Sequence, residues 1–389
     1  MNEPNKIKRG VDLELQIESL AYGGMGLARK DDFVIFVKGG IPGQKVNARI
    51  YKKKKGYAEA RVQHVITESP NAVEAPCDHF GTCGGCKTQN LSYDEQLNQK
   101  SNQVEDAFHR LGGFQDFKLD HIVGADPVFN YRNKMEFTFS PHRWVLDTEP
   151  EGVDRSFAVG LHIPGRYDKI LDINECHIQP TIGNKIMKVA REVCLAHPDL
   201  KPYDPKTHIG FLRFLMLRFG VNTNQIMVNL VTAYDDLNKL SPLIDALLEQ
   251  VPEITSMVNN VNTRKADVAF GEFETLVYGE PFIQENLGDL TFEISANSFF
   301  QTNTTQGKHL YDEVVKAAGL TGKEVVFDLY CGTGTIGLYL ANQVKEVYGF
   351  EIIRSALEDA EKNAQRNKIT NAIFLKANLD TFFKSGQLP

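Results

Sequence analysis

Three of the six cysteines of this chain fall within ten residues, in the run Cys77-Asp-His-Phe-Gly-Thr-Cys83-Gly-Gly-Cys86. The two glycines before Cys86 let the backbone wrap closely around a bulky group. Soft thiolate ligands on one loop are typical of iron–sulfur clusters and of zinc sites. Zinc sites more often pair their ligands as two Cys-X-X-Cys knuckles, so this run favours a [4Fe–4S] cluster over zinc.

A cluster of this kind needs a fourth ligand from elsewhere in the chain. Cys176, in the segment INECHIQP, is the best candidate for that ligand. Cys194 lies on the apolar face of a predicted helix, and we interpret it as a core residue because free cysteines are often buried. In a chain of this length, clustered cysteines indicate metal binding or catalysis rather than a disulfide framework.

A second motif follows a predicted strand and begins a predicted helix, in the segment DLYCGTGTIG. Its glycines Gly332, Gly334 and Gly337 have the G-x-G-x-x-G spacing of dinucleotide-binding loops. Glu351 ends the next predicted strand, 19 residues after Gly332, where an acidic residue binds ribose hydroxyls. By spacing alone, an NAD-dependent enzyme is therefore one interpretation.

Three features favour S-adenosylmethionine instead. Asp328 ends the strand beside the loop, where a carboxylate repels a pyrophosphate but attracts a sulfonium and an ammonium group. A helix and the polar segment SANSFFQTN precede this strand, whereas an NAD-binding fold often begins at the glycine strand. The loop side chains Tyr330 and Thr335 suit a methionine tail and a base.

The elements around these motifs predict a multidomain protein. Residues 11–68 alternate in short strands with glycine-rich turns, which predicts a small, OB-like β-barrel. Lysines 52–55 lie at a predicted turn between aromatic residues, as in barrels that bind single-stranded RNA. Residues 1–65 contain 13 Lys and Arg against 7 Asp and Glu, although the whole chain has a net charge of −7. This asymmetry indicates a basic module attached to an acidic body.

Further along the chain, a helix is expected at residues 92–113, ended by Gly112, and residues 127–280 mix strands with helices in an α/β middle domain. From about residue 293, strands alternate with helices, which predicts a Rossmann-like, doubly wound parallel sheet. Only three strands of this sheet precede Pro389, so we expect that domain to be incomplete. The predicted domains are residues 1–68, 69–292 and 293–389.

Taken in this order, the cysteine run, the separate Cys176, the N-terminal barrel and DLYCGTGTIGLYLA resemble the iron–sulfur family of RNA uracil-5-methyltransferases with an N-terminal TRAM domain. The segments LAYGGMGLAR and FVKGGIPGQKV are similar to TRAM sequences. The resemblance covers the whole chain. It implies a class I methyltransferase domain, S-adenosylmethionine and a [4Fe–4S] cluster as cofactors, and RNA as the substrate, with 23S ribosomal RNA favoured and transfer RNA as the alternative.

Carried onto this sequence, the family's cofactor contacts fall on five positions, Gln301, Tyr330, Thr335, Glu351 and Asn378, to which the loop spacing adds Gly332 and Gly334. Gln301 would contact the amino-acid end of the cofactor, Glu351 would accept the ribose hydroxyls, and Asn378 would lie near adenine. Thr335 departs from the family, which frequently has Asn there. The segment YRNKMEF matches a motif that the family uses around its RNA site. The predicted site residues are Gln301, Tyr330, Gly332, Gly334, Thr335, Glu351 and Asn378 for the cofactor, Cys77, Cys83, Cys86 and Cys176 for the cluster, and Arg132, Asn133 and Lys134 for RNA.

The family mechanism implied by the resemblance is a Michael-type addition. A cysteine thiolate adds to uracil C6, C5 then takes the methyl group, and a base removes the C5 proton from a flipped-out uridine. In the family, the nucleophile and the base lie beyond the asparagine of ANLD, and this chain ends eleven residues after Asn378. Cys331 lies in the cofactor loop, so we expect no catalytic residue among residues 1–389 and no methylation by this chain.

Two other classes of protein remain open at this stage. The first is a non-catalytic RNA-binding protein that keeps the barrel and the cluster, and the second is an NAD-dependent iron–sulfur oxidoreductase. No apolar run reaches the roughly 18 residues that a membrane helix needs, and no secretory signal is visible. We therefore expect a cytoplasmic monomer without a membrane partner.

Overall fold

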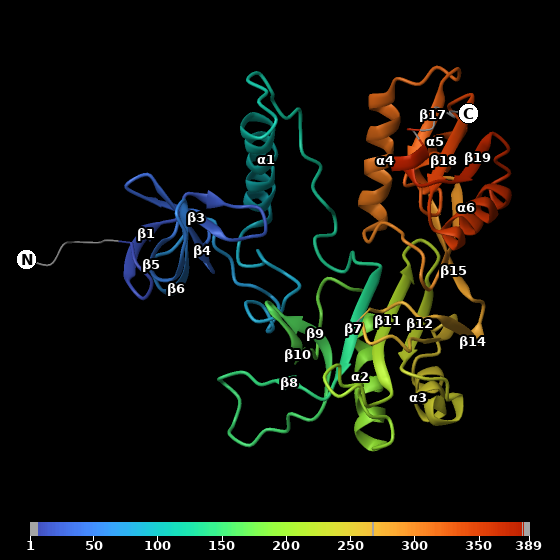
Figure 1. Cartoon of the computed structure of the whole chain (residues 1–389), viewed down its shortest axis with the longest axis horizontal. Coiled ribbons are helices and arrows are strands. Elements are labelled where there is room, and N and C mark those ends of the chain that lie inside the picture. The colour runs from blue at the N-terminus through green and yellow to red at the C-terminus, as the bar shows by residue number, and fades with distance from the viewer. Residues whose placement is uncertain (1–6, 267, 383, 385–389) are drawn as a thin grey trace, which may run out of the picture. The chain divides into compact units, whose positions relative to one another are not determined.

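The computed structural model describes residues 7–266, 268–382 and 384. The chain divides into two compact units, residues 1–124 and 125–389, each described here by itself (Figure 1). Within the described residues, no helix is long and apolar enough to cross a membrane. The boundaries that the sequence predicts at residues 68 and 292 stay predictions.

The first unit begins with a six-stranded sheet in the order β1-β5-β6-β4-β3-β2. Strands β1 and β2 stand at opposite ends of this order, yet only Ile17 and Glu18 separate them along the chain. The N–H of Ile17 donates to Gln44 on the β5 side, and that of Glu18 donates to Leu27 of β3. The sheet therefore closes on itself. Its strands are β1 (Asp12–Gln16), β2 (Ser19–Leu20), β3 (Gly26–Lys30), β4 (Phe33–Lys38), β5 (Lys45–Lys53) and β6 (Tyr57–Thr67).

The interior of this barrel is small and aliphatic. Buried and exposed residues alternate along β1, as expected for strands with one face on a core. Alanines in β3, β5 and β6 leave room for the larger side chains opposite them. The core residues are Leu13, Leu15, Ile17, Ala28, Ile35, Val37, Val46, Ala48, Ile50, Ala58 and Ala60.

Helix α1 (Tyr93–Arg110) packs beside the barrel in the same unit. The side chain of Gln99 accepts a hydrogen bond from the Leu20 N–H at 2.8 Å, and Gln103 donates to the Leu20 carbonyl at 2.9 Å. The predicted helix is confirmed, and it ends at Arg110 with Leu111 as its C-cap, so Gly112 follows the cap as predicted. Gly113, with φ +74°, takes the left-handed conformation, whereas Gly112 does not.

The second unit contains an eight-stranded mixed sheet in the order β14-β13-β12-β11-β7-β9-β10-β8. All nine residues of its strand β11 are buried, so both faces of the sheet are covered there. Two helices, α2 (Thr181–Ala196) and α3 (Leu237–Gln250), belong to this part. The strands are β7 (Lys134–Ser140), β8 (Arg143–Trp144), β9 (Ala158–Ile163), β10 (Arg166–Asp172), β11 (Leu212–Gly220), β12 (Gln225–Thr232), β13 (Ser256–Val261) and β14 (Phe273–Gly279).

The C-terminal part carries a three-stranded parallel sheet in the order β17-β18-β19. It alternates with helices as the sequence predicts, and Gly319 ends α4 in the left-handed conformation with φ +57°. Its elements are α4 (Thr304–Ala318), β17 (Val325–Leu329), α5 (Thr335–Ala341), β18 (Glu346–Glu351), α6 (Arg354–Arg366), β19 (Ala372–Lys376) and α7 (Leu379–Phe382).

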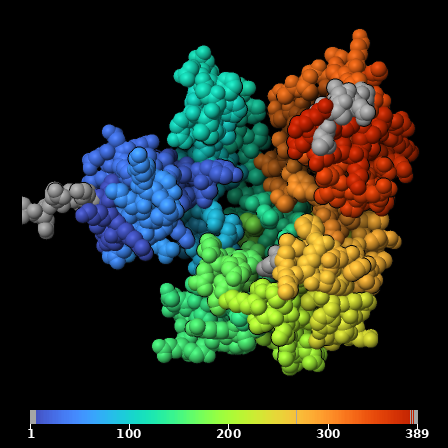
Figure 2. All heavy atoms as spheres, viewed as in Figure 1, coloured from blue at the N-terminus to red at the C-terminus, as the bar shows by residue number. Residues whose placement is uncertain are grey.

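A hairpin that the sequence analysis did not predict precedes this sheet. It consists of β15 (Phe282–Leu287) and β16 (Leu290–Ser295), so β16 crosses the domain boundary predicted at residue 292. Ile283 and Phe292 of the hairpin share one core cluster with Leu338 and Val347 of the C-terminal part. In Figure 2 the orange and red atoms of these segments lie directly against each other.

The predicted fold class is confirmed at the level of a multidomain chain, with an N-terminal β-sheet domain followed by α/β parts. Most strand pairs of the central sheet are antiparallel, and only β12–β13 and β8–β10 are parallel. The α/β character of this part therefore comes from the β12–α3–β13 crossover.

Candidate functional site

The candidate site lies at the carboxyl edge of the parallel sheet. Leu329 pairs in register with Phe350, and Glu351 pairs with Lys376. The residues that follow the three strands therefore meet at one edge, where open α/β sheets bind their ligands. This register brings the predicted residues Tyr330, Glu351 and Asn378 to the same edge.

The glycine loop between β17 and α5 has an unusual backbone. Tyr330, Gly332 and Gly334 all have positive φ angles, of 61°, 55° and 75°. A Cβ on Gly334 would lie 2.9 Å from the ring of Phe374, whereas a Cβ on Gly332 would meet no atom within 4 Å. Only glycine therefore fits at position 334 in both conformation and space. The Tyr330 side chain is 73% exposed and is free to contact a ligand.

Glu351 is buried and joins the loop to the end of β18. One carboxylate oxygen accepts the Gly332 N–H at 3.2 Å. The other accepts the N–H groups of Ile352 and Ile353 at 2.7 and 2.9 Å. These bonds hold the carboxylate at the carboxyl end of β18.

Asp328 lies beneath the loop. Its carboxylate accepts the Gly337 N–H of α5 at 2.8 Å. Burial raises the pKa of the Asp328 carboxyl above its usual value, and the Gly337 bond opposes that shift. A partly desolvated carboxylate of this kind attracts a cationic ligand strongly.

Cys331, the one cysteine of the loop, is buried beside these acids. Burial raises the pKa of its thiol to about 12, and the charges of Asp328 and Glu351 add to the shift. A thiol in such surroundings is not a thiolate at neutral pH, so it is a poor nucleophile.

Thr335 and Asn378, which are also predicted to contact the cofactor, differ in solvent exposure. Thr335 is buried, and its hydroxyl lies 3.2 Å from that of Thr333. Asn378 is exposed, and its side-chain oxygen accepts the Asp380 N–H at 3.0 Å at the start of α7. Thr335 therefore contributes mainly to the packing of the loop, whereas Asn378 stands at its rim.

Gln301 lies in the segment between β16 and α4. Its side chain hydrogen-bonds the hydroxyl of Tyr311, whose pKa burial raises to about 12 and which also feels the charge of Asp328. A Cβ on Gly307 would lie 3.1 Å from the Gln301 side chain, so α4 approaches closely here. Gln301 is thereby brought to the Asp328 side of the loop.

Two of the three residues predicted to bind RNA, Arg132 and Asn133, contact this same segment. The buried Asn133 side chain donates to the Gln301 carbonyl at 2.8 Å and to the Thr304 hydroxyl at 2.9 Å. Its backbone N–H donates to Thr302, and Arg132 forms a β-bridge with Asn303. Lys134 pairs with Glu136 at 2.6 Å. Asn133 therefore fixes the Gln301 segment, while Arg132 and Lys134 flank it.

Arg218 is a residue that the sequence analysis missed. It is 4% exposed, and its guanidinium donates to the carbonyls of Ala296, at 3.1 Å, and Ser298. Burial lowers its pKa to about 10. An arginine inside the apolar run LRFLMLRFG was the available signal, because a buried charge needs a specific partner.

The cysteine run forms an irregular loop in the first unit. Burial raises the pKa of both Cys77 and Cys83, and the charge of Cys86 contributes to each shift, so the three thiols lie near one another. The Gly85 N–H donates to the Cys83 sulfur at 3.4 Å. Cys176 is buried in the second unit, and its N–H donates to Asn184 at 2.9 Å. Within the described residues, no group of three or more His, Cys, Asp or Glu side chains is arranged to hold a metal ion.

Cys194, which was assigned to the core, is buried in α2, and burial raises its pKa to about 12. Of lysines 52–55, the first two end β5 of the barrel and the other two follow it, and Lys52 pairs with Glu59 at 2.6 Å. Lys53, Lys54 and Lys55 form no salt bridge among the described residues, although, after the Lys52 hydrogen bond, the charge of Lys54 helps to lower the pKa of Glu59.

Comparison with protein families matches residues 268–385 to the tRNA (Uracil-5-)-methyltransferase family and residues 6–63 to the TRAM domain. Over 384 residues, the chain is 40% identical to an uncharacterized RNA methyltransferase of Chlorobaculum tepidum, covering 97% of this chain and 79% of that protein. It is also 38% identical over 362 residues to an uncharacterized RNA methyltransferase of Halalkalibacterium halodurans, covering 93% and 76%.

Among solved structures, the chain is similar to the Pyrococcus abyssi tRNA (uracil-54, C5)-methyltransferase in complex with S-adenosyl-L-homocysteine. The TM-score is 0.70 and the sequence identity is 28%, covering 94% of this chain and 79% of that one. The likeness therefore extends over both units and includes the part of the chain that holds the glycine loop.

Proposed function

This chain belongs to the RNA (uracil-5-)-methyltransferase family, with an N-terminal TRAM domain, and we propose that it methylates C5 of a uridine in 23S ribosomal RNA. S-adenosylmethionine is the methyl donor of this reaction. The observation that carries the proposal is the loop after β17, where Asp328 and Glu351 flank glycines 332 and 334 at the carboxyl edge of the sheet.

Each site residue has a proposed role in holding the donor. The carboxylate of Glu351 receives the ribose hydroxyls, Tyr330 and Asn378 contact the base, and Gln301 contacts the amino-acid end. Gly332 and Gly334 give the donor close access to the backbone, and Thr335 supports the loop. Asp328 supplies a negative field for the positive charges of the donor. The bound donor supplies an electrophilic methyl group.

The nucleophile that activates uracil is the second part of the mechanism. Cys331 does not fit this role, because its pKa of about 12 leaves it protonated at neutral pH. We therefore propose that Cys331 is not the nucleophile. It is tested by mixing this chain with S-adenosylmethionine and RNA that contains 5-fluorouridine, which traps the covalent intermediate. We expect Cys331→Ser to leave adduct formation unchanged, and an adduct that Cys331→Ser abolishes would contradict this.

The target RNA is the least constrained part of the proposal. The structural neighbour from Pyrococcus abyssi acts on transfer RNA, which keeps transfer RNA as the alternative. The test deletes the gene in the cells that produce the protein and measures 5-methyluridine by mass spectrometry in separated RNAs. Loss from 23S ribosomal RNA supports the proposal, whereas loss from transfer RNA alone replaces it with the alternative.

We also propose that Cys77, Cys83, Cys86 and Cys176 hold a [4Fe–4S] cluster. The donor set fits in its chemistry: three thiols gather on one loop, and the Gly85 N–H points at the Cys83 sulfur, a bond that stabilises a thiolate. When bound, such a group would organise the loop rather than take part in methyl transfer.

The test of this proposal is iron and acid-labile sulfide content after anaerobic purification. We expect about four of each per chain, with loss in Cys83→Ser and in Cys176→Ser. Cys194→Ser is the matched control, because Cys194 is an equally buried thiol of the core. Equal iron content in all four proteins would refute the ligand set.

A further inference from the structure

A groove in the first unit lies between the barrel and α1, and none of the residues proposed to hold the methyl donor lines it. Its volume is about 810 Å³. One wall is the turn between β2 and β3, with Tyr22, Gly23 and Gly24, and the other wall is α1. Both glycines have positive φ angles, of 93° and 85°. The thirteen lining residues are Leu20, Tyr22, Gly23, Gly24, Lys87, Thr88, Gln96, Gln99, Lys100, Gln103, Val104, Ala107 and Phe108.

The walls of this groove are fixed in place by hydrogen bonds. Gln99 and Gln103 of α1 bond the backbone of Leu20 on both sides, at 2.8 and 2.9 Å. Gln96 accepts from the Thr88 hydroxyl at 3.0 Å and donates to the Leu91 carbonyl at 2.8 Å. Leu20 itself is buried against Ile41 and Leu91. The groove is therefore a preformed feature of the unit.

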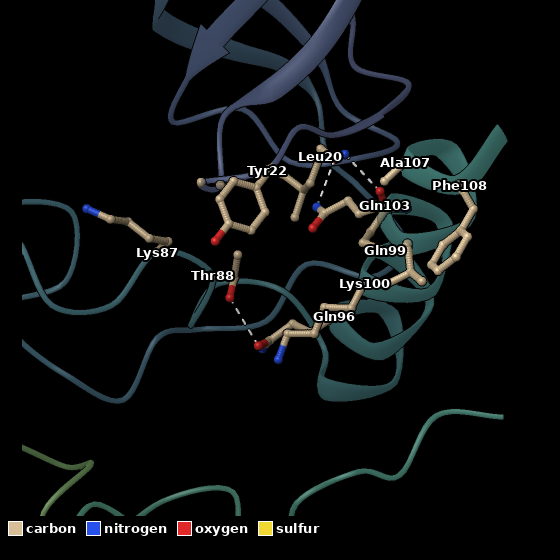
Figure 3. Close-up of a pocket in the computed structure, with 13 residues that line it drawn as sticks. Leu20, Tyr22, Lys87, Thr88, Gln96, Gln99, Lys100, Gln103, Ala107 and Phe108 are labelled. Carbon is tan, nitrogen blue, oxygen red and sulfur yellow. Dashed lines mark hydrogen bonds between the residues drawn. The ribbon is translucent and has the colours of Figure 1, made fainter. Parts of the chain in front are cut away.

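One large aromatic residue that lines this groove, Tyr22, is exposed to solvent and is not packed in a hydrophobic core. The Tyr22 side chain is 95% exposed, and Figure 3 shows it between Lys87 on one side and the face of α1 that carries Gln99 on the other. Beyond it, Val104 and Phe108 of α1 are 39% and 40% exposed. An aromatic ring and an apolar wall of this kind suit a flat, uncharged ring such as a nucleobase.

The charged residues that line the groove are all basic. Its lining contains two lysines and no acidic residue. Within the described part of the chain, Lys87 and Lys100 form no ion pair. Lys38 of the barrel lies near both Arg61 and Lys87, since burial lowers the pKa of Lys38 and the charges of these two residues lower it further. A cationic strip thus leads from the barrel into the groove, and its ligand must be anionic.

We propose that this groove binds an unpaired nucleotide of the RNA substrate, with its base on the Tyr22 ring and the flanking phosphates at Lys87 and Lys100. The proposal rests on the proposed function, because it takes RNA as the substrate. It adds a contact outside the site of methyl transfer, by which the enzyme recognises a single-stranded region.

The experiment measures binding of the full chain to a fluorescein-labelled 12-nucleotide oligouridylate by fluorescence anisotropy. Tyr22→Ala is expected to weaken binding about tenfold, since base stacking on an aromatic ring contributes that much, whereas Tyr22→Phe keeps the ring and the affinity. Lys100→Gln is expected to reduce the slope of log K against log salt by about 0.7, the value for one phosphate contact to a single strand. Lys118→Gln, an exposed lysine of the same unit outside the groove, leaves the slope unchanged.

Lys87 is left unchanged in these variants because it adjoins the proposed cluster ligand Cys86. Tyr22 and Lys100 are exposed, so their replacement leaves the fold intact, which circular dichroism checks. In a second measurement, an oligouridylate with one 5-iodouridine is irradiated on the chain, and the crosslinked peptide is expected to contain Tyr22.

The outcomes separate this inference from the proposed function. If the chain binds the oligouridylate, and Tyr22→Ala binds it equally well without a crosslink at Tyr22, the groove is not an RNA site while the methyltransferase function stands. If the chain does not bind the oligouridylate at all, the groove proposal also fails. The gene-deletion measurement of 5-methyluridine tests the enzymatic function independently of both results.

Discussion

Asn133 illustrates how a single residue connects the central sheet to the methyl-donor site. Its motif resembles one that the family uses around RNA, which would place the side chain at the surface. In the structure the amide is buried and bonds the Gln301 carbonyl and the Thr304 hydroxyl. An amide bonded in this way positions the segment that we propose contacts the donor, and the neighbours Arg132 and Lys134 are left as the candidates for RNA contact.

Replacing Asn133 with Ala should therefore weaken both the fold and donor binding. The change removes the donor to the buried Thr304 hydroxyl and to the part-buried Gln301 carbonyl, and an unsatisfied buried group costs about 1–3 kcal/mol. Thermal unfolding measures the first effect, and titration calorimetry with S-adenosylmethionine measures the second. Asn102→Ala on the exposed side of α1 is the control and should change neither. Unchanged donor affinity in Asn133→Ala would show that Gln301 does not depend on this bond.

The raised pKa of Asp328 predicts that donor binding depends on pH. Because burial raises its pKa above the usual 3.8, protonation begins at a higher pH than for an ordinary aspartate. The cationic donor binds the charged form, so its affinity should be present above the raised pKa and should fall as the pH falls through it. Asp328→Asn should bind the donor more weakly at pH 7.5, with no such fall. Identical pH profiles for the two proteins would contradict this.

Without the donor, the raised pKa of Asp328 makes the folding stability depend on pH in the opposite direction. A carboxyl whose pKa is raised by folding stabilises the fold below its unfolded pKa and loses that contribution as the pH rises through the folded pKa. At neutral pH, Asp328 therefore costs stability that the bound donor offsets.

At the scale of elements, the loop between β17 and α5 depends on two glycines in different ways. Gly334 has a positive φ and no space for a Cβ, whereas Gly332 has a positive φ but open space around it. The residue at position 334 also lets the loop lie against the ring of Phe374 of β19. The shape of the loop is thus set by both the turn itself and its packing.

We expect Gly334→Ala to lower donor affinity more than Gly332→Ala does. Backbone strain of about 1–3 kcal/mol applies to both, and the clash with Phe374 at 2.9 Å applies only to the first. Calorimetric titration with S-adenosylmethionine compares them, and circular dichroism confirms that each variant is folded. Equal losses in the two variants would mean that packing against Phe374 is unimportant.

The β15–β16 hairpin shows why one element escaped prediction. Its sequence FIQENLGDLTFEIS alternates in burial on both strands, and Gly288 in its turn has φ +61°. That pattern is typical of a hairpin, but its polar residues resemble a loop. Only the structure shows that Ile283 and Phe292 complete the core beneath α5 and β18.

At the scale of the whole molecule, each compact unit has its own core and its own candidate site. All the residues proposed to contact the donor belong to the unit of residues 125–389. The groove at Tyr22 and the loop of Cys77–Cys86 belong to the unit of residues 1–124. Binding of donor and of RNA should therefore be measurable separately.

Hydrogen exchange with and without S-adenosylmethionine tests this separation. We expect slower exchange at the amides of Gly332, Gly337, Ile352 and Ile353, because a bound ligand stabilises the states that keep these bonds closed. Amides of the barrel strands β1 to β6 should exchange at unchanged rates. Protection that appears in the barrel but not in the loop would contradict the proposed donor site.

The sequence by itself determined the parts of this protein that are local in the chain. The glycine spacing, the acid 19 residues later and the strand–helix alternation are read from neighbouring residues, and the parallel sheet and its loop follow from them. Only the tertiary structure decided the roles of Asn133 and Arg218, the packing of the β15–β16 hairpin and the groove at Tyr22. These depend on contacts between residues as far as 171 positions apart, and long-range contacts of this kind leave no periodic signal in the sequence.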